Sequence, residues 1–402
     1  MQKVFQIDIA NDGNNVIIEQ ESVCVTHHGG CMIDKIKEQF KNFDFPLFIA
    51  TICLTVIGII LISSATKSMS GGSKNVIIQI AALILGIAAC LVVAFWDYEY
   101  LATKSYYIFG INVLLLVAVL ILGTGAEEWG GKSWIRFGPI GVQPSELVKI
   151  GFIICLAAQL AHFKEELNRP QKFLWTLLHA GTLLGLILLQ PDMGTAMVFA
   201  VIYAGMLFVA KLSYKYIITA IAAFVASTPL IWMFVLDGYQ KNRILVFLNP
   251  ELDPQKSGYQ VIQSKIAIGS GQITGEGLYS GIQTQLGFLP ARHTDFIFAV
   301  AGEELGFIGC LLIIGLIIFI IARCFCIGQN AKNSLGGFMA VGVGVMLLAQ
   351  SFENIGMTIG LTPVTGITLP FLSYGGSSIV TNFIAIGLVL NVCRKRKVIN
   401  FG

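Results

Sequence analysis

Residues 287–321 read GFLPARHTDFIFAVAGEELGFIGCLLIIGLIIFII, and the change in character at Phe296 decides the class of fold. The polar part ends at Asp295, whereas the part from Phe296 to Ile321 is apolar except for Glu303 and Glu304. An apolar run of about 20 residues is long enough to cross a bilayer as a helix. The stretch therefore predicts a membrane-spanning helix that begins directly after a polar segment.

Similar apolar runs recur along the rest of the chain. Hydrophobic residues make up 55% of the sequence and charged residues 12%, and the mean hydropathy is +0.77, which excludes an ordinary soluble domain. The runs lie at about residues 46–65, 76–96, 106–122, 147–162, 173–190, 193–210, 215–235, 296–321, 335–360 and 376–393. We therefore predict an all-α polytopic membrane protein with about ten transmembrane helices, in a transmembrane domain that covers residues 44–397.

The distribution of Lys and Arg predicts how these helices are oriented. Short cytoplasmic loops carry an excess of both residues, and residues 394–397 form the densest basic cluster. With an even number of helices, both termini then lie in the cytoplasm. Loops 124–145, 236–295 and 361–375 face outward, so the largest of them, 236–295, is an extracytoplasmic loop between the seventh and eighth helices.

Two short segments flank the transmembrane domain. Residues 1–43 are predicted to form a cytoplasmic extension with a small β-hairpin and an amphipathic helix, and residues 398–402 a short cytoplasmic tail. Four residues of the extension have a spacing that suits zinc, namely Cys24, His27, His28 and Cys31. A solvated linker with chance thiols explains the same residues and is the favoured interpretation.

Asp295 is the sharpest candidate for chemistry. It lies at the end of the large outward loop, which also carries the cations Arg243 and Arg292. A carboxylate held among cations at a membrane surface suits chemistry on a lipid-borne anion. The alternative is that Asp295 caps the eighth helix, and the two roles are compatible.

Other ionisable and hydroxyl residues lie where predicted helices begin. Glu146 and Lys149 are three residues apart, so they share a helix face and can pair, either structurally or as part of a cavity. Asp192 is expected to cap the sixth helix rather than to bind substrate. Residues 373–378, SYGGSS, open the tenth helix, where hydroxyls and free amides make an anion site or a plain cap.

Four separated motifs resemble one known family. The motifs are QPSE at 143–146, QPDMGT at 190–195, FLP with HTDFIF at 288–298, and PFLSYGGSS at 370–378. Together they closely resemble the SEDS family, which includes RodA, FtsW and SpoVE, over about residues 44–397. The segments YQKNRI at 239–244 and NIGM at 354–357 are more similar to RodA than to FtsW.

The resemblance implies a bacterial peptidoglycan glycosyltransferase in the cytoplasmic membrane. Such a protein polymerises lipid II, the undecaprenyl-pyrophosphate-linked precursor, and works with a class B penicillin-binding protein in an elongation or division complex. The family's essential aspartate falls on Asp295, and its paired Glu and Lys fall on Glu146 and Lys149. No nucleic-acid partner is expected.

The expected reaction is attack by a sugar 4-hydroxyl on the anomeric carbon of a pyrophosphate-linked glycan. Asp295 deprotonates the acceptor, or it holds a divalent cation such as Mg²⁺ or Mn²⁺, while Lys149, Arg243 and Arg292 stabilise the pyrophosphate. The remaining residues expected to bind substrate are Glu146, Lys132, Trp134, Ser373 and Ser377. A flippase that transports lipid II is the main alternative, and a non-catalytic scaffold is the third.

Overall fold

The computed structural model describes residues 42–69, 71–124, 133–137, 140–235, 238–253 and 257–396. The account below concerns the unit that begins at Asp44. The predicted N-terminal hairpin, amphipathic helix and zinc ligands lie outside the described residues, as do Lys132 and the C-terminal tail.

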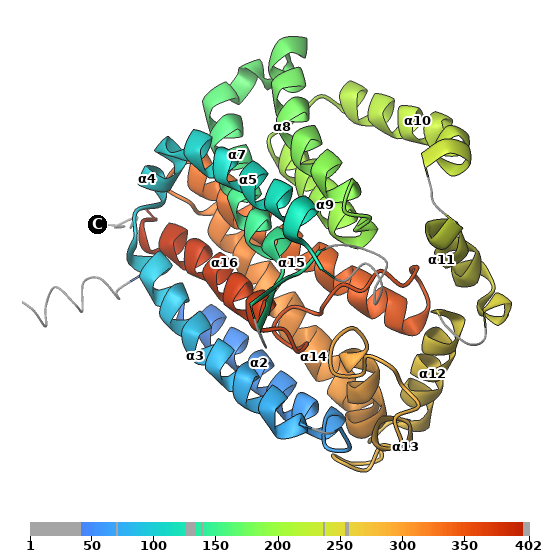
Figure 1. Cartoon of the computed structure of the whole chain (residues 1–402). Coiled ribbons are helices and arrows are strands. Elements are labelled where there is room, and N and C mark those ends of the chain that lie inside the picture. Colours follow the sequence, from blue (N-terminus) through green and yellow to red (C-terminus); the bar gives the residue numbers. More distant parts are fainter. Residues whose placement is uncertain are drawn as a thin grey trace, which may run out of the picture. The chain divides into compact units, whose positions relative to one another are not determined.

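Long apolar helices dominate the described part of the chain (Figure 1). Nine of them are long and apolar enough to cross a membrane, and α9 is a shorter apolar helix. These nine helices, together with the shorter α9, are α2 (Phe45–Ala65), α3 (Gly72–Phe95), α5 (Ser105–Leu122), α7 (Pro144–Phe163), α8 (Pro170–Leu188), α9 (Met193–Val209), α10 (Tyr214–Leu230, continued by η2, Ile231–Val235), α14 (Ile297–Gln329), α15 (Ser334–Ile359) and α16 (Gly376–Arg394). The prediction of a polytopic helical membrane protein is confirmed.

Short elements connect these helices. The short helix α4 (Tyr98–Thr103) precedes α5, and the 3₁₀ helix η1 (Lys164–Asn168) follows α7. Before α7, the strands β1 (Ile135–Phe137) and β2 (Ile140–Val142) pair antiparallel, with Arg136 opposite Gly141. The sequence did not predict this hairpin, because its strands of three residues are too short to show an alternating pattern.

The predicted outward loop between the seventh and eighth helices contains helices of its own. These are α11 (Gly238–Leu248), the 3₁₀ helix η3 (Pro250–Leu252), α12 (Ser257–Ser270) and α13 (Ile282–Gln285). Charged residues interrupt the apolar positions of α11, so its sequence shows no continuous apolar run. In Figure 1 these elements lie at the ends of α14 and α15.

The helices α15 and α16 form the centre of the described bundle, since 72% and 78% of their most apolar windows are buried. Small residues let neighbouring helices approach α15 closely. A Cβ added to Gly342 would lie 2.7 Å from Ile153 of α7 and 2.9 Å from the sulfur of Met206 on α9. These contacts pack α7 and α9 against α15. The first residues of α7 and α9 therefore lie beside the C-terminal end of α15.

Helix α14 is longer than predicted and is broken at one residue. It continues to Gln329, eight residues beyond the predicted end at Ile321, so Cys324 and Cys326 lie in the helix. At Gly306 the backbone leaves the helical region, with φ 67° and ψ −165°. The break leaves backbone groups on both sides of Gly306 without partners inside the helix.

Residues 272–277 supply the missing partners. The N–H groups of Glu276 and Gly277 donate to the carbonyls of Glu303 and Glu304 at 2.9 and 3.1 Å. On the other side of the break, Phe307 and Ile308 donate to Gln272 and Ile273 at 2.9 and 3.2 Å. The glycine-rich segment is therefore docked on α14 through its backbone, and we call these four bonds the Gly306 splice.

We expect Gly306→Ala to destabilise the protein by about 1–3 kcal/mol, because Ala disfavours a positive φ. An added Cβ would also overlap the backbone of Gly275 and lie 2.7 Å from the carbonyl oxygen of Ile273. Thermal unfolding in detergent measures the effect. Gly315→Ala on the same helix is the matched control, because a Cβ there meets nothing within 4 Å; equal unfolding midpoints would contradict the prediction.

Candidate active site

Asp295 lies in a turn that precedes α14. Its residues turn back on themselves, with the N–H groups of Thr294 and Phe296 both donating to the carbonyl of Ala291, at 3.1 and 3.3 Å. The N-cap residue of α14 is Phe296, and no side chain caps the helix. The expectation that Asp295 caps this helix was therefore wrong, and its carboxylate is available for another role.

Two side chains fasten this turn to the segment that joins α15 to α16. The buried amide of Asn354 donates from Nδ2 to the carbonyl of Asp295 at 2.8 Å and to that of Ile367 at 2.7 Å. The hydroxyl of Ser373 donates to the carbonyl of Thr294 at 2.7 Å and accepts from the N–H of Leu369 at 2.8 Å. We call Asn354 and Ser373 the Asp295 clamp, because together they fix the position of the Asp295 backbone relative to the segment between α15 and α16.

The surroundings of Asp295 favour its protonated form. The side chain keeps partial access to solvent, yet protein atoms surround it densely. This desolvation raises the pKa of the carboxyl from its ordinary value near 3.8 to about 6, although a hydrogen bond with Thr294 and the charge of Arg243 oppose the rise. A carboxyl with such a pKa is still largely ionised near neutral pH and is a better base than an ordinary aspartate.

Glu146 and Lys149 form the ion pair that their spacing predicts. The Lys149 Nζ lies 2.6 Å from Glu146 Oε1, and both side chains are buried in the first turns of α7. In the described part of the chain, Glu146 Oε2 has no hydrogen-bond partner. The pair is thus completely removed from solvent but keeps one oxygen unsatisfied.

Two further carboxylates lie close to this pair. Asp192 caps α9, as predicted, by accepting from the N–H and hydroxyl of Thr195 at 3.0 and 2.8 Å. Buried Glu353 on α15 lies within electrostatic reach of both Lys149 and Asp192. The start of α7 and the end of α15 therefore bring Glu146 and Glu353 near one buried lysine, and Asp192 at the start of α9 lies near Glu353.

A single segment separates this group from Asp295. A Cβ added to Gly194 at the start of α9 would lie 2.8 Å from Thr365 and 3.1 Å from Glu353. Gly366, which follows Thr365 in the chain, faces Asp295 instead, since a Cβ added to Gly366 would lie 3.6 Å from Asp295 Oδ2. The adjacent residues Glu353 and Asn354 show the same division. Glu353 lies near Lys149 and Asp192, whereas Asn354 binds the carbonyl of Asp295. The predicted carboxylates and Lys149 therefore meet at one end of the bundle.

The other predicted substrate residues are placed differently. Arg292 is buried and donates from Nε to the carbonyl of Ala65 at 2.7 Å and from NH2 to the hydroxyl of Ser68 at 2.9 Å, so its guanidinium binds the end of α2. Ser377 is half-buried in the first turn of α16. Trp134 forms an isolated β-bridge with Thr124.

Sequence reasoning did not assign Asn354 and Glu353 to this site. Asn354 and Glu353 are polar residues inside an apolar run, a pattern that marks a function or a buried partner in a spanning helix.

Among the described residues no group of three or more His, Cys, Asp or Glu side chains could hold a metal ion. Asp295 is thus a lone carboxylate, which suits a divalent cation only where a ligand supplies further oxygens. Mg²⁺ is commonly held in this way, through one carboxylate and substrate phosphates.

Comparison with known proteins identifies the family. The family model described as cell cycle protein, for FtsW, RodA and SpoVE, matches residues 45–398. The chain belongs to the FtsW/RodA/SpoVE family. The resemblance seen in the sequence motifs is thereby confirmed.

Curated relatives of the FtsW/RodA/SpoVE family cover nearly the same length. One is the probable peptidoglycan glycosyltransferase FtsW of Trichlorobacter lovleyi, 36% identical over 90% of this chain and 96% of the relative. Another is the peptidoglycan glycosyltransferase MrdB of Escherichia coli K12, also 36% identical, over 89% of this chain and 95% of the relative. The curated relatives are thus named as enzymes of one activity.

Solved structures of the family share the fold. A chain from a study of the structural coordination of polymerization and crosslinking by a peptidoglycan synthase complex is 30% identical, with a TM-score of 0.75 over 88% of this chain and 98% of that chain. The rod shape determining protein RodA of Thermus thermophilus is 27% identical, with a TM-score of 0.66 over 89% of this chain and 98% of that chain.

We expect Asn354→Ala to lower activity about 10- to 100-fold. The variant loses the hydrogen bond that holds the Asp295 backbone, and a small displacement of a catalytic group slows the reaction strongly. Loosening also admits water to the carboxyl, so the acidic limb of the pH–activity profile should move below its wild-type position near pH 6. Thr358→Val, which removes a neighbouring buried hydroxyl bonded only to its own helix at 2.7 Å, is the control. An unshifted profile in Asn354→Ala would show that the amide does not position Asp295.

Proposed function

We propose that this protein is a peptidoglycan glycosyltransferase that polymerises lipid II at the outer face of the cytoplasmic membrane. The observation that carries the proposal is the clamped carboxyl of Asp295, with its raised pKa, at the bundle end where Lys149 and Arg243 also act. The names of the curated relatives support the same activity.

In the proposed reaction, the 4-hydroxyl of one lipid-linked glycan attacks the anomeric carbon of another. Its proton passes to the carboxylate of Asp295 as the new carbon–oxygen bond forms. The bond from the anomeric carbon to the pyrophosphate breaks, and the electron pair leaves with the polyprenyl pyrophosphate. One base suffices because pyrophosphate is a good leaving group whose charge nearby cations stabilise.

A divalent cation is the alternative role for Asp295. The lone carboxylate would contribute one ligand, and the substrate phosphates would contribute the others. When bound, the cation would supply positive charge to the leaving group, and Asp295 would then position the phosphates instead of accepting the proton.

The placement of the ionisable residues favours polymerisation over lipid transport. Transport through the bilayer predicts carboxylates and other charged groups along the full depth of the bundle. Instead, Glu146, Asp192 and Glu353 lie near the start of α7, the start of α9 and the end of α15, on the same side as Asp295. We propose that this side faces outward and that both termini are cytoplasmic.

The partner and cellular role are also proposals. We infer that a class B penicillin-binding protein works with this chain, since the synthase complex among its structural relatives couples polymerization to crosslinking. We assign the chain to elongation and cell shape rather than to division, on the similarity of residues 239–244 and 354–357 to RodA.

The test is gel analysis of glycan products from labelled lipid II, using purified protein with and without its penicillin-binding partner and with Mg²⁺, Mn²⁺ or a chelator. Polymer made by the wild type is the expected result. Folded protein that makes no polymer with the partner bound would instead favour a transporter or a scaffold, and a liposome assay of lipid II translocation would separate those two.

A further inference from the structure

Two adjacent carboxylates of α14 have no part in the proposed reaction. Glu303 and Glu304 lie in the second turn of the helix, and their exposed fractions are 0% and 1%. Burying two carboxylates in an apolar helix is costly unless hydrogen bonds satisfy them. The partners of the two side chains therefore show what they do.

Glu303 binds the start of α13. The N–H of Gln283 donates to its Oε1 at 2.6 Å, and the N–H and hydroxyl of Thr284 donate to its Oε2 at 3.0 and 2.5 Å. A helix as short as α13 has no internal acceptors for its first N–H groups and is not stable alone. The Glu303 carboxylate supplies these acceptors, so it fixes α13 against α14.

Glu304 binds the end of α2. The hydroxyl of Ser64 donates to Glu304 Oε1 at 2.5 Å. The side-chain amide of Gln285, in α13, donates to the carbonyl and the hydroxyl of Ser64 at 3.2 and 3.1 Å. The next carbonyl of α2, that of Ala65, accepts from Arg292. The end of α2 is therefore joined to α14, to α13 and to the turn that precedes α14.

The segment from α13 to Asp295 is bound at both ends. At its start, the carbonyl of Gln283 accepts from the N–H groups of Phe288 and Leu289 at 3.1 and 3.4 Å, and Leu289 is fully buried. At its end, α2 binds Arg292 and the Asp295 clamp holds the turn. A displacement of α13 or of the end of α2 is thus expected to displace the Asp295 carboxyl as well.

We propose that Glu303 and Glu304 are positioning residues for Asp295. They hold α13 and the end of α2, and these two elements support the turn in addition to the Asp295 clamp. Both carboxylates act through the backbone that carries Asp295 rather than on the reacting atoms. The proposal rests on the proposed function and adds the supports of its essential carboxyl.

A simpler role for the two carboxylates is to stabilise α14 and its neighbours. That role predicts a lower unfolding temperature and no specific change in the segment that carries Asp295. Hydrogen exchange of residues 283–296 and the rate of polymerisation therefore have to be measured beside the unfolding temperature.

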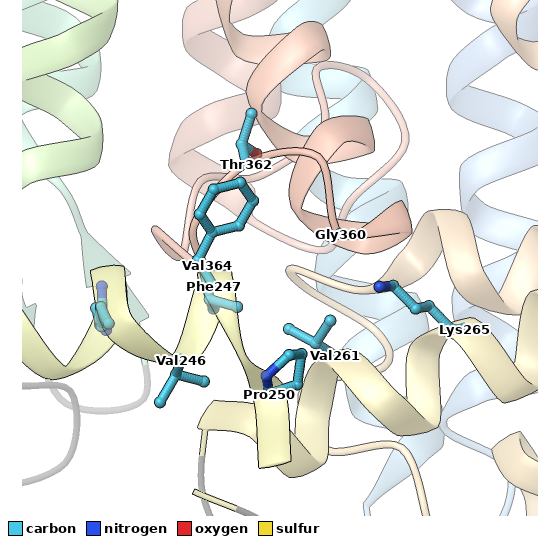
Figure 2. Close-up of a pocket in the computed structure, with 9 residues that line it drawn as sticks. Val246, Phe247, Pro250, Val261, Lys265, Gly360, Thr362 and Val364 are labelled. Atoms are coloured by element: carbon cyan, nitrogen blue, oxygen red, sulfur yellow. The ribbon is translucent and has the colours of Figure 1, made fainter. Parts of the chain in front are cut away.

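Helix α12 supplies a reference segment, because it is held to α15 by contacts of its own. The hydroxyl of Ser264 donates to the carbonyl of Thr358 at 2.7 Å. Figure 2 shows the Lys265 side chain extending from α12 toward Gly360, where an added Cβ would lie 2.5 Å from Lys265 Nζ. Exchange of residues 259–266 is therefore expected to be independent of Glu303 and Glu304.

The test variants are Glu303→Leu and Glu304→Leu in the purified full-length chain, since leucine suits an apolar helix and removes the acceptors. We expect each to quicken hydrogen–deuterium exchange of residues 283–296 at least about tenfold and to leave residues 259–266 within about twofold. The kcat for lipid II polymerisation should fall about 10- to 100-fold while KM stays within about threefold, because a displaced Asp295 slows the chemical step and leaves substrate binding unchanged. Glu303→Gln keeps one acceptor oxygen, so it should recover part of both effects.

Ile313→Ala is the control for loss of stability. Ile313 is fully buried in α14 beyond the break, and its truncation leaves a cavity that lowers the unfolding temperature. The variant should keep the wild-type exchange of residues 283–296 and the wild-type kcat. If it changes both as strongly as Glu303→Leu, the effects report stability alone and the proposal fails.

A Glu303→Leu or Glu304→Leu variant with wild-type exchange of residues 283–296, or with wild-type kcat, refutes the role of that carboxylate, whatever its unfolding temperature. If Glu303→Leu does not fold, Thr284→Val removes only the hydroxyl that donates at 2.5 Å and keeps the shape of the side chain. It should quicken exchange of the segment about fivefold, and unchanged exchange contradicts the proposal.

An Asp295→Asn background separates this inference from the proposed function. Hydrogen exchange requires no catalysis, so Glu303→Leu should quicken the segment in that background too. If the wild type makes no polymer but the exchange effect is present, the glycosyltransferase is refuted and the anchoring of the turn stands. If the wild type makes polymer and Glu303→Leu matches its kcat, the positioning role alone is refuted.

Discussion

Asp295→Asn should reduce lipid II polymerisation about 10²- to 10⁴-fold while leaving the protein folded. The substitution keeps the shape of the side chain and the backbone bonds to Asn354 and Ser373, but it removes the group that accepts a proton or binds a cation. The wild-type activity should fall as the pH drops through about 6, the raised pKa of this carboxyl. Product gels at several pH values measure both effects.

The same variant should be more stable than wild type at pH 7.5. A folded-state pKa raised from 3.8 to about 6 means that the native protein binds this proton more tightly than the unfolded chain. The stabilisation is complete below about pH 3.8 and is lost as the pH rises through about 6. At pH 7.5 the ionised carboxylate therefore costs roughly 1–2 kcal/mol, after allowance for its partial exposure, and asparagine removes that cost.

Asp295→Leu is the control for the shape of the site, since it should be inactive and gain no more stability than Asp295→Asn. Retention of activity in Asp295→Asn would remove this residue from the mechanism. A flat activity profile between pH 5 and 7 in the wild type would show that its ionisation is not required.

Lys149→Met should lower the free energy of unfolding by about 3–5 kcal/mol. The substitution leaves the buried carboxylate of Glu146 without its cation in a region closed to solvent. The double variant Glu146→Gln with Lys149→Met removes both charges and should recover most of that stability. Thermal unfolding in detergent compares the three proteins.

Activity of the double variant decides between the two interpretations of the pair. We expect it to be folded but at least about 100-fold less active, because in the proposed reaction Lys149 supplies positive charge that stabilises the leaving pyrophosphate. Glu166→Gln with Arg169→Met, which removes an exposed pair at 3.0 Å, is the control for charge removal. A fully active Glu146/Lys149 double variant would make the buried pair purely structural.

Much of the fold was predictable because apolar runs of about 20 residues alternate with polar segments along this chain. The boundary between the fifth and sixth apolar runs depended on only three residues, 190–192, and the structure confirms the predicted cap by Asp192. The Glu146–Lys149 pair was equally predictable, because helical spacing alone brings the two side chains together.

The rest depended on contacts between distant segments. Nothing in the sequence near Asp295 shows that Asn354, 59 residues later, holds its carbonyl. The break at Gly306 is hidden as well, because glycine is common in apolar helices and the partners of the exposed backbone groups lie about 30 residues earlier. The close approach of the Lys265 side chain to Gly360 is likewise invisible in the sequence, because Lys265 belongs to α12 and Gly360 is the C-cap of α15.

The Gly306 splice has a consequence for the order in which the protein assembles. Residues 306–329 alone make a helix of about 36 Å, enough to cross the hydrocarbon core of a bilayer. In the conformation broken at Gly306, the preceding turns cannot enter that core before residues 272–277 arrive, because the carbonyls of Glu303 and Glu304 would have no partner there. A newly inserted chain is therefore expected to hold its spanning helices first and to close the outer part of α14 afterwards, so the surroundings of Asp295 mature last.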